Sequence, residues 1–376
     1  MKNLLTIRHV KQFASHVLAI TLVLGLTGQF ALAKKKDKKR EKTQQEICEL
    51  ALKKPPKVQD LVEAFKAEAA ENSPVISAEK LKFINVGGKD VYNISAEFNT
   101  KMNGQDIRVL MGRVEARDDE KNSEVWFFTE TATRGVFEPV EGAPKYDMQD
   151  PFFFFYKGEL VIGGVQVYEV PGQKNLTYDT VFFRDNGQGI ASLTEFTRGP
   201  AKMKDIRGFE MEDGRLFIVA RPQNEDPKLG GRGKNSFIIV NNLDGLTADA
   251  VNRAKIMQKQ VRNKQWIGTN QIQSYKGKMV MLSHVAYYKH QEINDDRGYY
   301  VALYTMENPQ PRIILIREML PNGLFGESKR PDLVDVLFAG GFIINDDDTL
   351  TIYVGAGDAE AYRVTIKMPD LEEFND

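Results

Sequence analysis

The sequence has almost no cysteine: Cys48 is the only one among 376 residues. It cannot form an intramolecular disulfide, so the fold must be held by packing and hydrogen bonds, for which a chain of this length has enough material. Histidine is also scarce, and only His284 and His290 lie beyond residue 33. This argues against a histidine-rich zinc site and leaves few candidates for a Ser-His-Asp triad. We therefore expect no metal and no other cofactor.

The chain lacks an excess of either charge. Lys and Arg number 51 against 52 Asp and Glu, for a formal net charge of −1. Without a basic excess we expect no nucleic-acid partner. Positive charge is concentrated only in Lys34–Lys42, which we interpret as part of a solvated, flexible tail over residues 34–54. The alternative for this stretch is peripheral contact with an anionic surface such as a membrane.

Long apolar runs are also missing. The longest candidate, Val17–Leu26, is shorter than the ~20 residues that a membrane-spanning helix needs. It follows the positive residues Lys2, Arg8 and Lys11 and precedes Ala31-Leu32-Ala33, a pattern typical of a cleaved secretory signal over residues 1–33. We therefore expect a periplasmic or secreted protein. An uncleaved N-terminal anchor is the alternative.

Two segments have helical spacing. Val58, Leu61, Val62 and Phe65 predict an amphipathic helix within residues 55–74, at about 57–70. A second helix is predicted over residues 246–261, with Thr247 as its N-cap.

Strands dominate from residue 75 onward, and they repeat. Residues 149–165 read as an acid, a buried aromatic strand, a Lys-Gly turn and a second strand. The same order recurs at intervals of 55–65 residues, with lead residues Asp90, Asp150, Asp205, Asn270 and Asp335. Strand repeats of this length are typical of propeller blades. We predict an all-β fold, a five-bladed β-propeller over residues 75–370 with a short N-terminal helical segment, in which residues 81–86 complete the last blade.

In a propeller the inner strands meet around one axis, so lead residues far apart in sequence are expected to share a central funnel. Several acids there need nearby cations, and the sequence offers these: Arg113, Arg117, Lys204, Arg207, Arg221 and Arg330. Acids and bases in one funnel suit a glycan, and glycoside cleavage uses two carboxyl groups. Each lead Asp fits turn capping equally well. Trp266 is either a sugar platform or core, and His284 either a buried histidine or an anion contact.

Short motifs spread over residues 90–366 resemble glycoside hydrolase family 130, five-bladed propellers that act on mannosides, and still more closely an uncharacterised bacterial family of the same superfamily. The motifs are Tyr92-Asn93-Ile94-Ser95, Gly112-Arg113-Val114-Glu115, Gln149-Asp150-Pro151, Lys204-Asp205, Ala220-Arg221-Pro222, Ser283-His284 and the stretch from Phe338 to Asp358.

The resemblance implies that Asp150 is the general acid. It also implies that Asp205 and Asp90 orient the sugar or tune the proton that Asp150 donates. It implies a substrate-binding set consisting of Asn93, Arg113, Glu115, Arg117, Lys204, Arg207, Arg221, Trp266, Asn270, His284, Arg330, Asp335, Asp358 and Glu360. The phosphate-gripping cluster of that family is matched only by Arg221 and His284, and Phe152 stands where the family has Arg. These departures favour hydrolysis over phosphorolysis. A non-catalytic glycan- or protein-binding propeller of the cell envelope is the alternative, and the oligomeric state is not predicted.

Overall fold

The computed structural model describes residues 55–119, 122–172, 176–222, 233–290 and 296–371. All of them belong to one compact unit that begins at Pro55. The predicted signal peptide and basic tail, residues 1–33 and 34–54, lie outside the described residues. Within the described ranges, no helix combines the length and apolar character needed to cross a membrane.

The amphipathic helix is present as α2 (Val58–Glu71), within one residue of the prediction. Its buried face consists of Val58, Val62 and Phe65, which pack into an apolar cluster with Phe217 and Ile313. The backbone N–H of Val58 donates to Gln265 Oε1 at 2.9 Å, so the first turn is tied to the sheet region as well.

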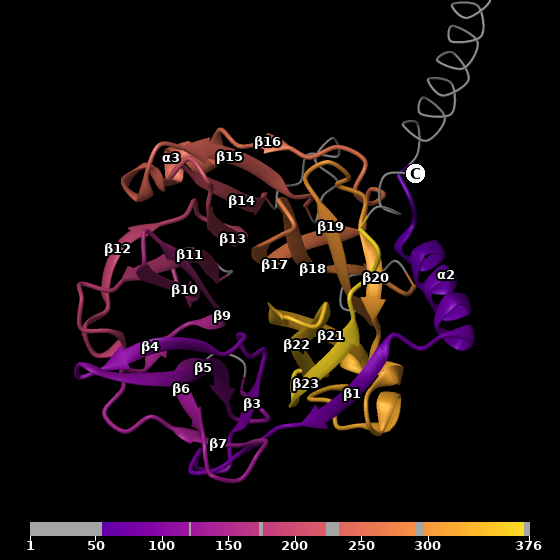
Figure 1. Cartoon of the computed structure of the whole chain (residues 1–376), viewed down its shortest axis with the longest axis horizontal. Helices are drawn as coiled ribbons and strands as arrows, with labels where there is room; N and C mark the ends of the chain where they lie inside the picture. The colour runs from indigo at the N-terminus through magenta and orange to yellow at the C-terminus, as the bar shows by residue number, and fades with distance from the viewer. Residues whose placement is uncertain (1–54, 120–121, 173–175, 223–232, 291–295, 372–376) are drawn as a thin grey trace, which may run out of the picture. The chain divides into compact units, whose positions relative to one another are not determined.

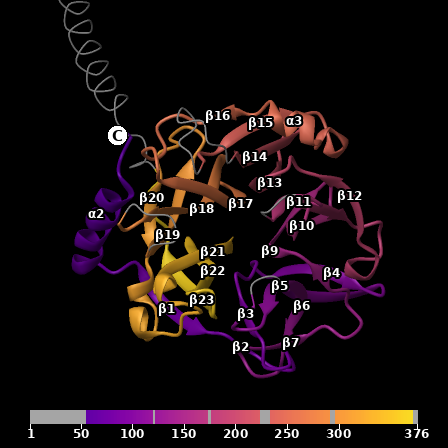
Figure 2. The same cartoon turned by 180° about the vertical axis from the view of Figure 1, so that it is seen from behind.

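The strands form four hydrogen-bonded sheets around a centre (Figures 1 and 2). The first sheet contains β2 (Lys82–Phe83), β3 (Asp90–Tyr92), β4 (Phe98–Met102), β5 (Gln105–Glu115), β6 (Glu124–Glu130), β7 (Val136–Pro139) and β8 (Tyr146–Asp147). The second contains β9 (Gln149–Tyr156), β10 (Glu159–Tyr168), β11 (Thr177–Arg184) and β12 (Thr194–Arg198). The third contains β13 (Met203–Glu210), β14 (Leu216–Pro222), β15 (Ser236–Val240) and β16 (Lys255–Ile256).

The remaining sheet has eight strands and two antiparallel parts. One part contains β17 (Trp266–Tyr275), β18 (Lys278–Tyr288), β19 (Arg297–Thr305) and β20 (Arg312–Leu315). The other contains β21 (Asp335–Ile344), β22 (Thr349–Ala356), β23 (Glu360–Lys367) and β1 (Val75–Lys80). A short parallel pairing of β19 with β21 joins them. Short 3₁₀ turns connect the strands at η1 (Ile190–Ser192), η3 (Leu243–Gly245), η4 (Arg317–Met319), η5 (Gly323–Phe325) and η6 (Pro331–Leu333).

This arrangement is an all-β, propeller-like fold. The inner strands are β3, β9, β13, β17 and β21. The last four contact one another across the centre, and β3 contacts β22 and β23 of the last group. Apolar clusters fill the seams between neighbouring antiparallel groups: Phe152 and Phe154 of β9, for example, pack with Ile206 of β13 and Ile218 of β14. The core is therefore distributed around the centre as a series of seams, and the central ends of the strands remain available for polar side chains.

The two ends of the described unit meet in the last antiparallel group. β1 pairs with β23 from Val75↔Ile366 to Lys80↔Tyr362. The prediction that residues 81–86 complete the last blade is wrong, because Lys82–Phe83 pairs with β7 of the first sheet instead. β1 is an outer strand with only half-buried or exposed residues, so it has no apolar alternation that the sequence could display.

The predicted Lys-Gly turn between the first two strands of the repeat is confirmed. Lys157 and Gly158 both have positive φ, 50° and 77°, as a two-residue type I′ hairpin requires. The second predicted helix is much shorter than expected. It is α3 (Ala248–Asn252), with Thr247 Oγ1 accepting from the Ala250 N–H at 3.2 Å, and it ends before β16 because that strand pairs with β15.

Each inner strand is interrupted at one residue. The pairing register shifts at Asp150 in β9, at Asp205 in β13, at Asn270 in β17 and at Gly340 in β21. Asn93, directly after β3, interrupts the first sheet in the same way, since the next backbone bond runs from Ser95 N–H to Met111 O. Such bulges re-aim a side chain out of the regular pleat. The interruptions set the positions of the polar groups at the centre.

Gly340 is the only glycine among the five residues that interrupt the inner strands, and we expect this position to accept no larger residue. A Cβ at Gly340 would overlap the carbonyl oxygen of Ile94. Gly340→Ala should therefore lower the free energy of unfolding by about 3 kcal/mol in urea titrations. Gly87→Ala, at an exposed positive-φ position with open space around it, is the control and should cost about 1 kcal/mol. Equal losses in the two variants would contradict the close approach.

Candidate functional site

Asp150 lies at the meeting point of the first two sheets. Asn93 Nδ2 donates to Asp150 Oδ1 at 3.0 Å, and Arg113 Nη1 lies 3.5 Å from the same oxygen. The Asp150 side chain is 16% exposed, so a ligand can still reach it. Asp150 and Asn93 have φ of 51° and 46°. Strained backbone of this kind clusters at functional sites, and Asp and Asn tolerate it best among non-glycine residues.

Asp205 occupies the corresponding place in the third sheet, with φ 55°, and is buried. Arg221 Nε donates to its Oδ2 at 2.5 Å, and His284 Nε2 lies 3.8 Å from the same oxygen. His284 Nδ1 forms a hydrogen bond of 3.0 Å with Asn270 Oδ1. The interruption sites are thus linked in two pairs: Asn93 with Asp150 directly, and Asp205 with Asn270 through His284.

The two acids are held in their charged form. Burial raises the pKa of Asp150, but the charges of Arg113 and Lys204 and the hydrogen bond from Asn93 outweigh it and hold that pKa below its usual range. Burial likewise opposes ionisation of Asp205, and Arg221 overcomes it, lowering the pKa to about 2. Both carboxyls are therefore anionic at neutral pH.

Two further cations face this group without a carboxylate partner of their own among the described residues. Arg207 donates through Nε to the Asn270 carbonyl at 2.7 Å, and its guanidinium lies 3.9 Å from the centroid of the Phe152 ring. Burial lowers the pKa of Arg207 to about 10 and also lowers that of Lys204, whose Nζ lies 5.0 Å from the centroid of the Tyr178 ring. Arg207 is buried and Lys204 is half-buried. Cations that are largely shielded from water and lack a carboxylate can receive an anionic ligand.

Asp358 is a third carboxyl near Arg113. It is half-buried, has φ 53° in the turn between β22 and β23, and makes no hydrogen bond to the described residues through its side chain. Burial raises the pKa of Asp358, and the negative charge of Asp150 raises it further. The charge of Arg113 opposes this increase. The pKa values of Asp150 and Asp358 are displaced in opposite directions, so in the free protein Asp358 holds a proton more readily than Asp150.

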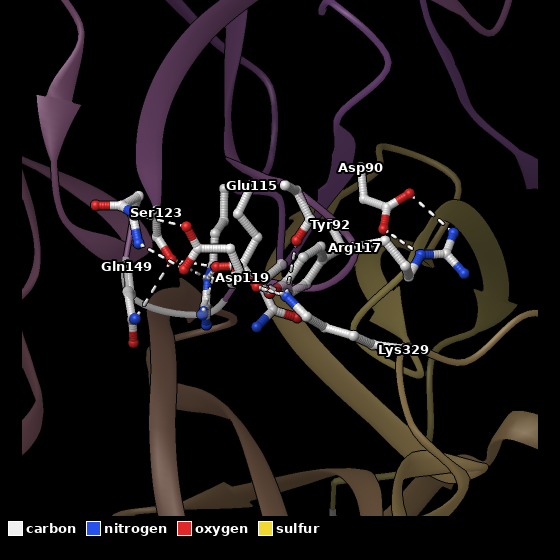
Figure 3. A network of polar contacts seen from close by, with 12 residues as sticks. Asp90, Tyr92, Glu115, Arg117, Asp119, Ser123, Gln149 and Lys329 are labelled. Atoms are coloured by element: carbon white, nitrogen blue, oxygen red, sulfur yellow. Dashed lines mark hydrogen bonds and ion pairs between the residues drawn. The ribbon is translucent and has the colours of Figure 1, made fainter.

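Arg113 is anchored from behind by Glu115. Arg113 Nε and Nη2 donate to Glu115 Oε2 at 3.0 and 2.8 Å, and Glu115 also accepts from Tyr92, Ser123 and Lys329 (Figure 3). Glu115 is fully buried, so it does not line the funnel as predicted for a substrate-binding residue.

Asp90 and Asp335 are not placed as predicted. Both begin an inner strand, three and five residues before the interruption, and each is paired locally. Asp90 accepts from Arg117 Nε at 2.5 Å (Figure 3). Asp335 accepts from the Tyr300 hydroxyl at 2.6 Å. The predicted lead residues of the first and last repeats are therefore wrong. Asn93 and Gly340 are the residues of those repeats that correspond to Asp150, Asp205 and Asn270.

Three more predicted residues make other contacts. Arg330 pairs with its neighbour Asp332 at 2.9 Å, and Glu360 is buried against Lys80 at 2.5 Å. Trp266 is only 2% exposed and packs edge-on against Tyr299, so it is core and offers no platform for a sugar.

Sequence reasoning missed Lys329 and Tyr299. Tyr299 is half-buried and stacks on His284 with ring centroids 5.5 Å apart. Neither residue belongs to a motif or a lead position, and no signal in a single sequence connects them to the acids. Within the described ranges, no three His, Cys, Asp or Glu side chains gather in a way that would hold a metal ion.

The chain matches one protein family and several solved structures. Residues 67–372 match the model of a family described as "Protein of unknown function (DUF1861)". The chain is similar to MPT-4, a mannose phosphorylase from Leishmania mexicana solved with phosphate ion, at 29% identity and TM-score 0.70, covering 84% of this chain and 95% of that one. It is similar to MPT-1, a GDP-Man-dependent mannosyltransferase from Leishmania mexicana, at 27% identity and TM-score 0.67, covering 81% and 93%.

A β-1,2-mannobiose phosphorylase from Listeria innocua shares the fold at 14% identity and TM-score 0.50, covering 80% of this chain and 93% of that one. No curated protein matches the chain. The predicted resemblance to propellers of the mannoside phosphorylase type, and to a family of unknown function among them, is confirmed.

The surroundings of His284 lead to a pH prediction. Burial lowers its pKa to about 4, although the charge of Asp205 opposes this, so the ring is neutral at pH 7. An unfolded histidine titrates near ~6.5, so the unfolded state binds the proton first and the stability contributed by neutral His284 falls as the pH drops from about 6.5 to 4. Nuclear magnetic resonance of labelled histidine, assigned with His284→Gln, should show no titration above pH 5. A midpoint at 6.5 or higher would contradict the buried, neutral ring.

Proposed function

The chain belongs to the family described as "Protein of unknown function (DUF1861)", and from this premise we propose that it is a mannoside-type glycoside hydrolase with Asp150 as its general acid. One observation carries the proposal. Asp150 sits at a strained interruption, 16% exposed, and is contacted by Asn93 and Arg113 from another sheet. A capping aspartate would bond to nearby backbone N–H groups, whereas the contacts of Asp150 are to side chains that a sugar can share.

The charge of Asp150 constrains the reaction. A general acid must carry a proton, and the pKa of Asp150 is held low in the free protein. Asp150 therefore takes up its proton only when a bound sugar shields it from Arg113 and Lys204, or at acidic pH, and we expect activity to rise as the pH falls. Asp358, which also faces Arg113, is our candidate for the second carboxyl. Because burial raises the pKa of Asp358, this role requires that bound substrate reverse the order of the two pKa values, so that Asp150 holds the proton and Asp358 is ionised.

Phosphorolysis is the second candidate, and the two cations Lys204 and Arg207 favour it. Neither has a carboxylate partner among the described residues, and both approach the acids that would face the scissile bond. Arg207 donates through Nε and Nη1 to the backbone carbonyls of Asn270 and Ile206, so Nη2 is the nitrogen with which it would bind phosphate. The similarity to a mannose phosphorylase solved with phosphate is consistent with this assignment. The two reactions differ in product: free mannose from water, mannose 1-phosphate from phosphate.

Two finer points of the prediction belong to this proposal. We count five blades by treating the eight-stranded sheet as two, because its halves are joined only at Gly298↔Asp335 and Tyr299↔Val336. We also propose export through a cleaved signal over residues 1–33, with an uncleaved N-terminal anchor as the alternative. For Lys34–Lys42 the two proposals are a solvated tail and a peripheral membrane contact. If export involves cleavage, sequencing of the secreted protein should find Lys34 at the N-terminus. Recovery of Met1 in a soluble cellular fraction would exclude it.

Substitution of Asp150 tests the catalytic assignment. Asp150→Asn should reduce kcat on mannose disaccharides by about 10²–10⁴, the usual contribution of a positioned general acid, with sugar binding retained. Product analysis with and without inorganic phosphate distinguishes hydrolysis from phosphorolysis.

The matched control is Asp213→Asn, which alters an exposed turn acid paired with Arg215 and should leave kcat unchanged. Binding of sugar by the unmodified protein without turnover in either condition would favour the non-catalytic glycan-binding alternative. Full activity of Asp150→Asn would exclude Asp150 as the acid.

A further inference from the structure

Glu115 is a carboxylate that no ligand can reach. Its side chain is 0% exposed, and both of its oxygens are occupied. Oε1 accepts from the Tyr92 hydroxyl and Lys329 Nζ, and Oε2 accepts from Ser123 and from Arg113. These four residues, with Arg113 donating through both Nε and Nη2, hold the pKa of Glu115 below its usual range, and Arg113 makes the largest contribution against burial. The side chain is therefore a permanent buried anion.

Lys329 brings a cation to this anion from a distant part of the chain. It lies between η5 and η6, its side chain is 3% exposed, and its Nζ contacts Glu115 and the carbonyls of Ala116 and Asp119, the latter two at 3.2 Å. Figure 3 shows the side chain reaching across to Glu115 and Tyr92. The Lys329 backbone N–H also donates to Gly357 O at 2.7 Å, next to Asp358. One residue thus links the last strand group to the first.

Charges alternate from Lys329 to the candidate acid. Lys329 is bound to Glu115, Glu115 holds Nε and Nη2 of Arg113, and Arg113 Nη1 faces Asp150 at 3.5 Å. Because Nε and Nη2 are committed to Glu115, the guanidinium has one orientation toward Asp150. Changing the charge at one end of this series changes the potential at the other, since the intermediate groups are buried and weakly screened.

We propose that Glu115 and Lys329 are positioning residues that fix Arg113 and thereby set the protonation of Asp150. The consequence of this positioning for catalysis rests on the proposed function. The effect of Glu115 and Lys329 on the protonation of Asp150 does not. A buried ion pair adds little to stability by itself, because apolar residues of similar volume often stabilise the same contact as well or better. An electrostatic role gives the pair a use that an apolar seam would lack, and the two charges have opposite effects on Asp150.

Three variants of the full chain test this. Lys329→Met leaves Glu115 uncompensated and should raise the pKa of Asp150 by about 1 pH unit. Glu115→Gln leaves Arg113 and Lys329 uncompensated and should keep Asp150 ionised to lower pH than in the unmodified protein. The double variant restores the charge balance and should return the midpoint toward the original. The readout is the carboxyl carbon resonance of Asp150 against pH, assigned with Asp150→Asn, and it needs no activity.

Lys66→Met is the matched control. It removes a lysine from an exposed ion pair with Glu318 and should leave the Asp150 midpoint unchanged. Opposite shifts in the two single variants support the proposal, whether or not the protein turns over a mannoside. Unchanged midpoints, or shifts of the same sign, overturn it. Should Lys329→Met fail to fold, Tyr92→Phe removes a neutral donor from Glu115 and must shift the midpoint upward, opposite to Glu115→Gln, for the proposal to stand.

Discussion

The candidate site depends on the break in pairing of each inner strand. A regular strand would place successive side chains in the two seams beside it, where the apolar clusters lie. The register shifts at Asp150, Asp205 and Asn270, and the turn at Asn93, release one residue per strand from that alternation. Polar side chains from segments 55 or more residues apart thereby meet at one place without disturbing the apolar seams.

Charge pairing then decides what these side chains can do. Asp205 is buried and bonded to Arg221, whereas Asp150 shares Arg113 with the buried Glu115 and keeps some exposure. The acid that remains partly open is the one with the longer cation contact, 3.5 Å against 2.5 Å. A substrate can compete for it, because the Arg113 contact is longer and the guanidinium is anchored elsewhere. Asp205 is better suited to hold Arg221 and His284 in place.

Local features could be predicted from the sequence and long-range ones could not. The α2 helix, the Lys157-Gly158 hairpin and the central place of Asp150 follow from apolar spacing, turn chemistry and a motif. The ends of the repeat were misaligned because Gly340 carries no side chain and Asp90 and Asp335 mimic a lead acid. The sequence did not show that β1 completes the last strand group, because an outer strand has no buried face. It did not show the role of Lys329, because its partner Glu115 is 214 residues away.

The central claim is that a sugar binds where the interrupted strands meet, in contact with Asp150. The most direct measurement is a crystal structure of the Asp150→Asn variant soaked with a mannose disaccharide. The account predicts sugar density at the centre, with one glycosidic oxygen within hydrogen-bonding distance of position 150 and hydroxyls on Arg113 and Asn93. Density confined to the outer strands, with the centre occupied only by water, would contradict it.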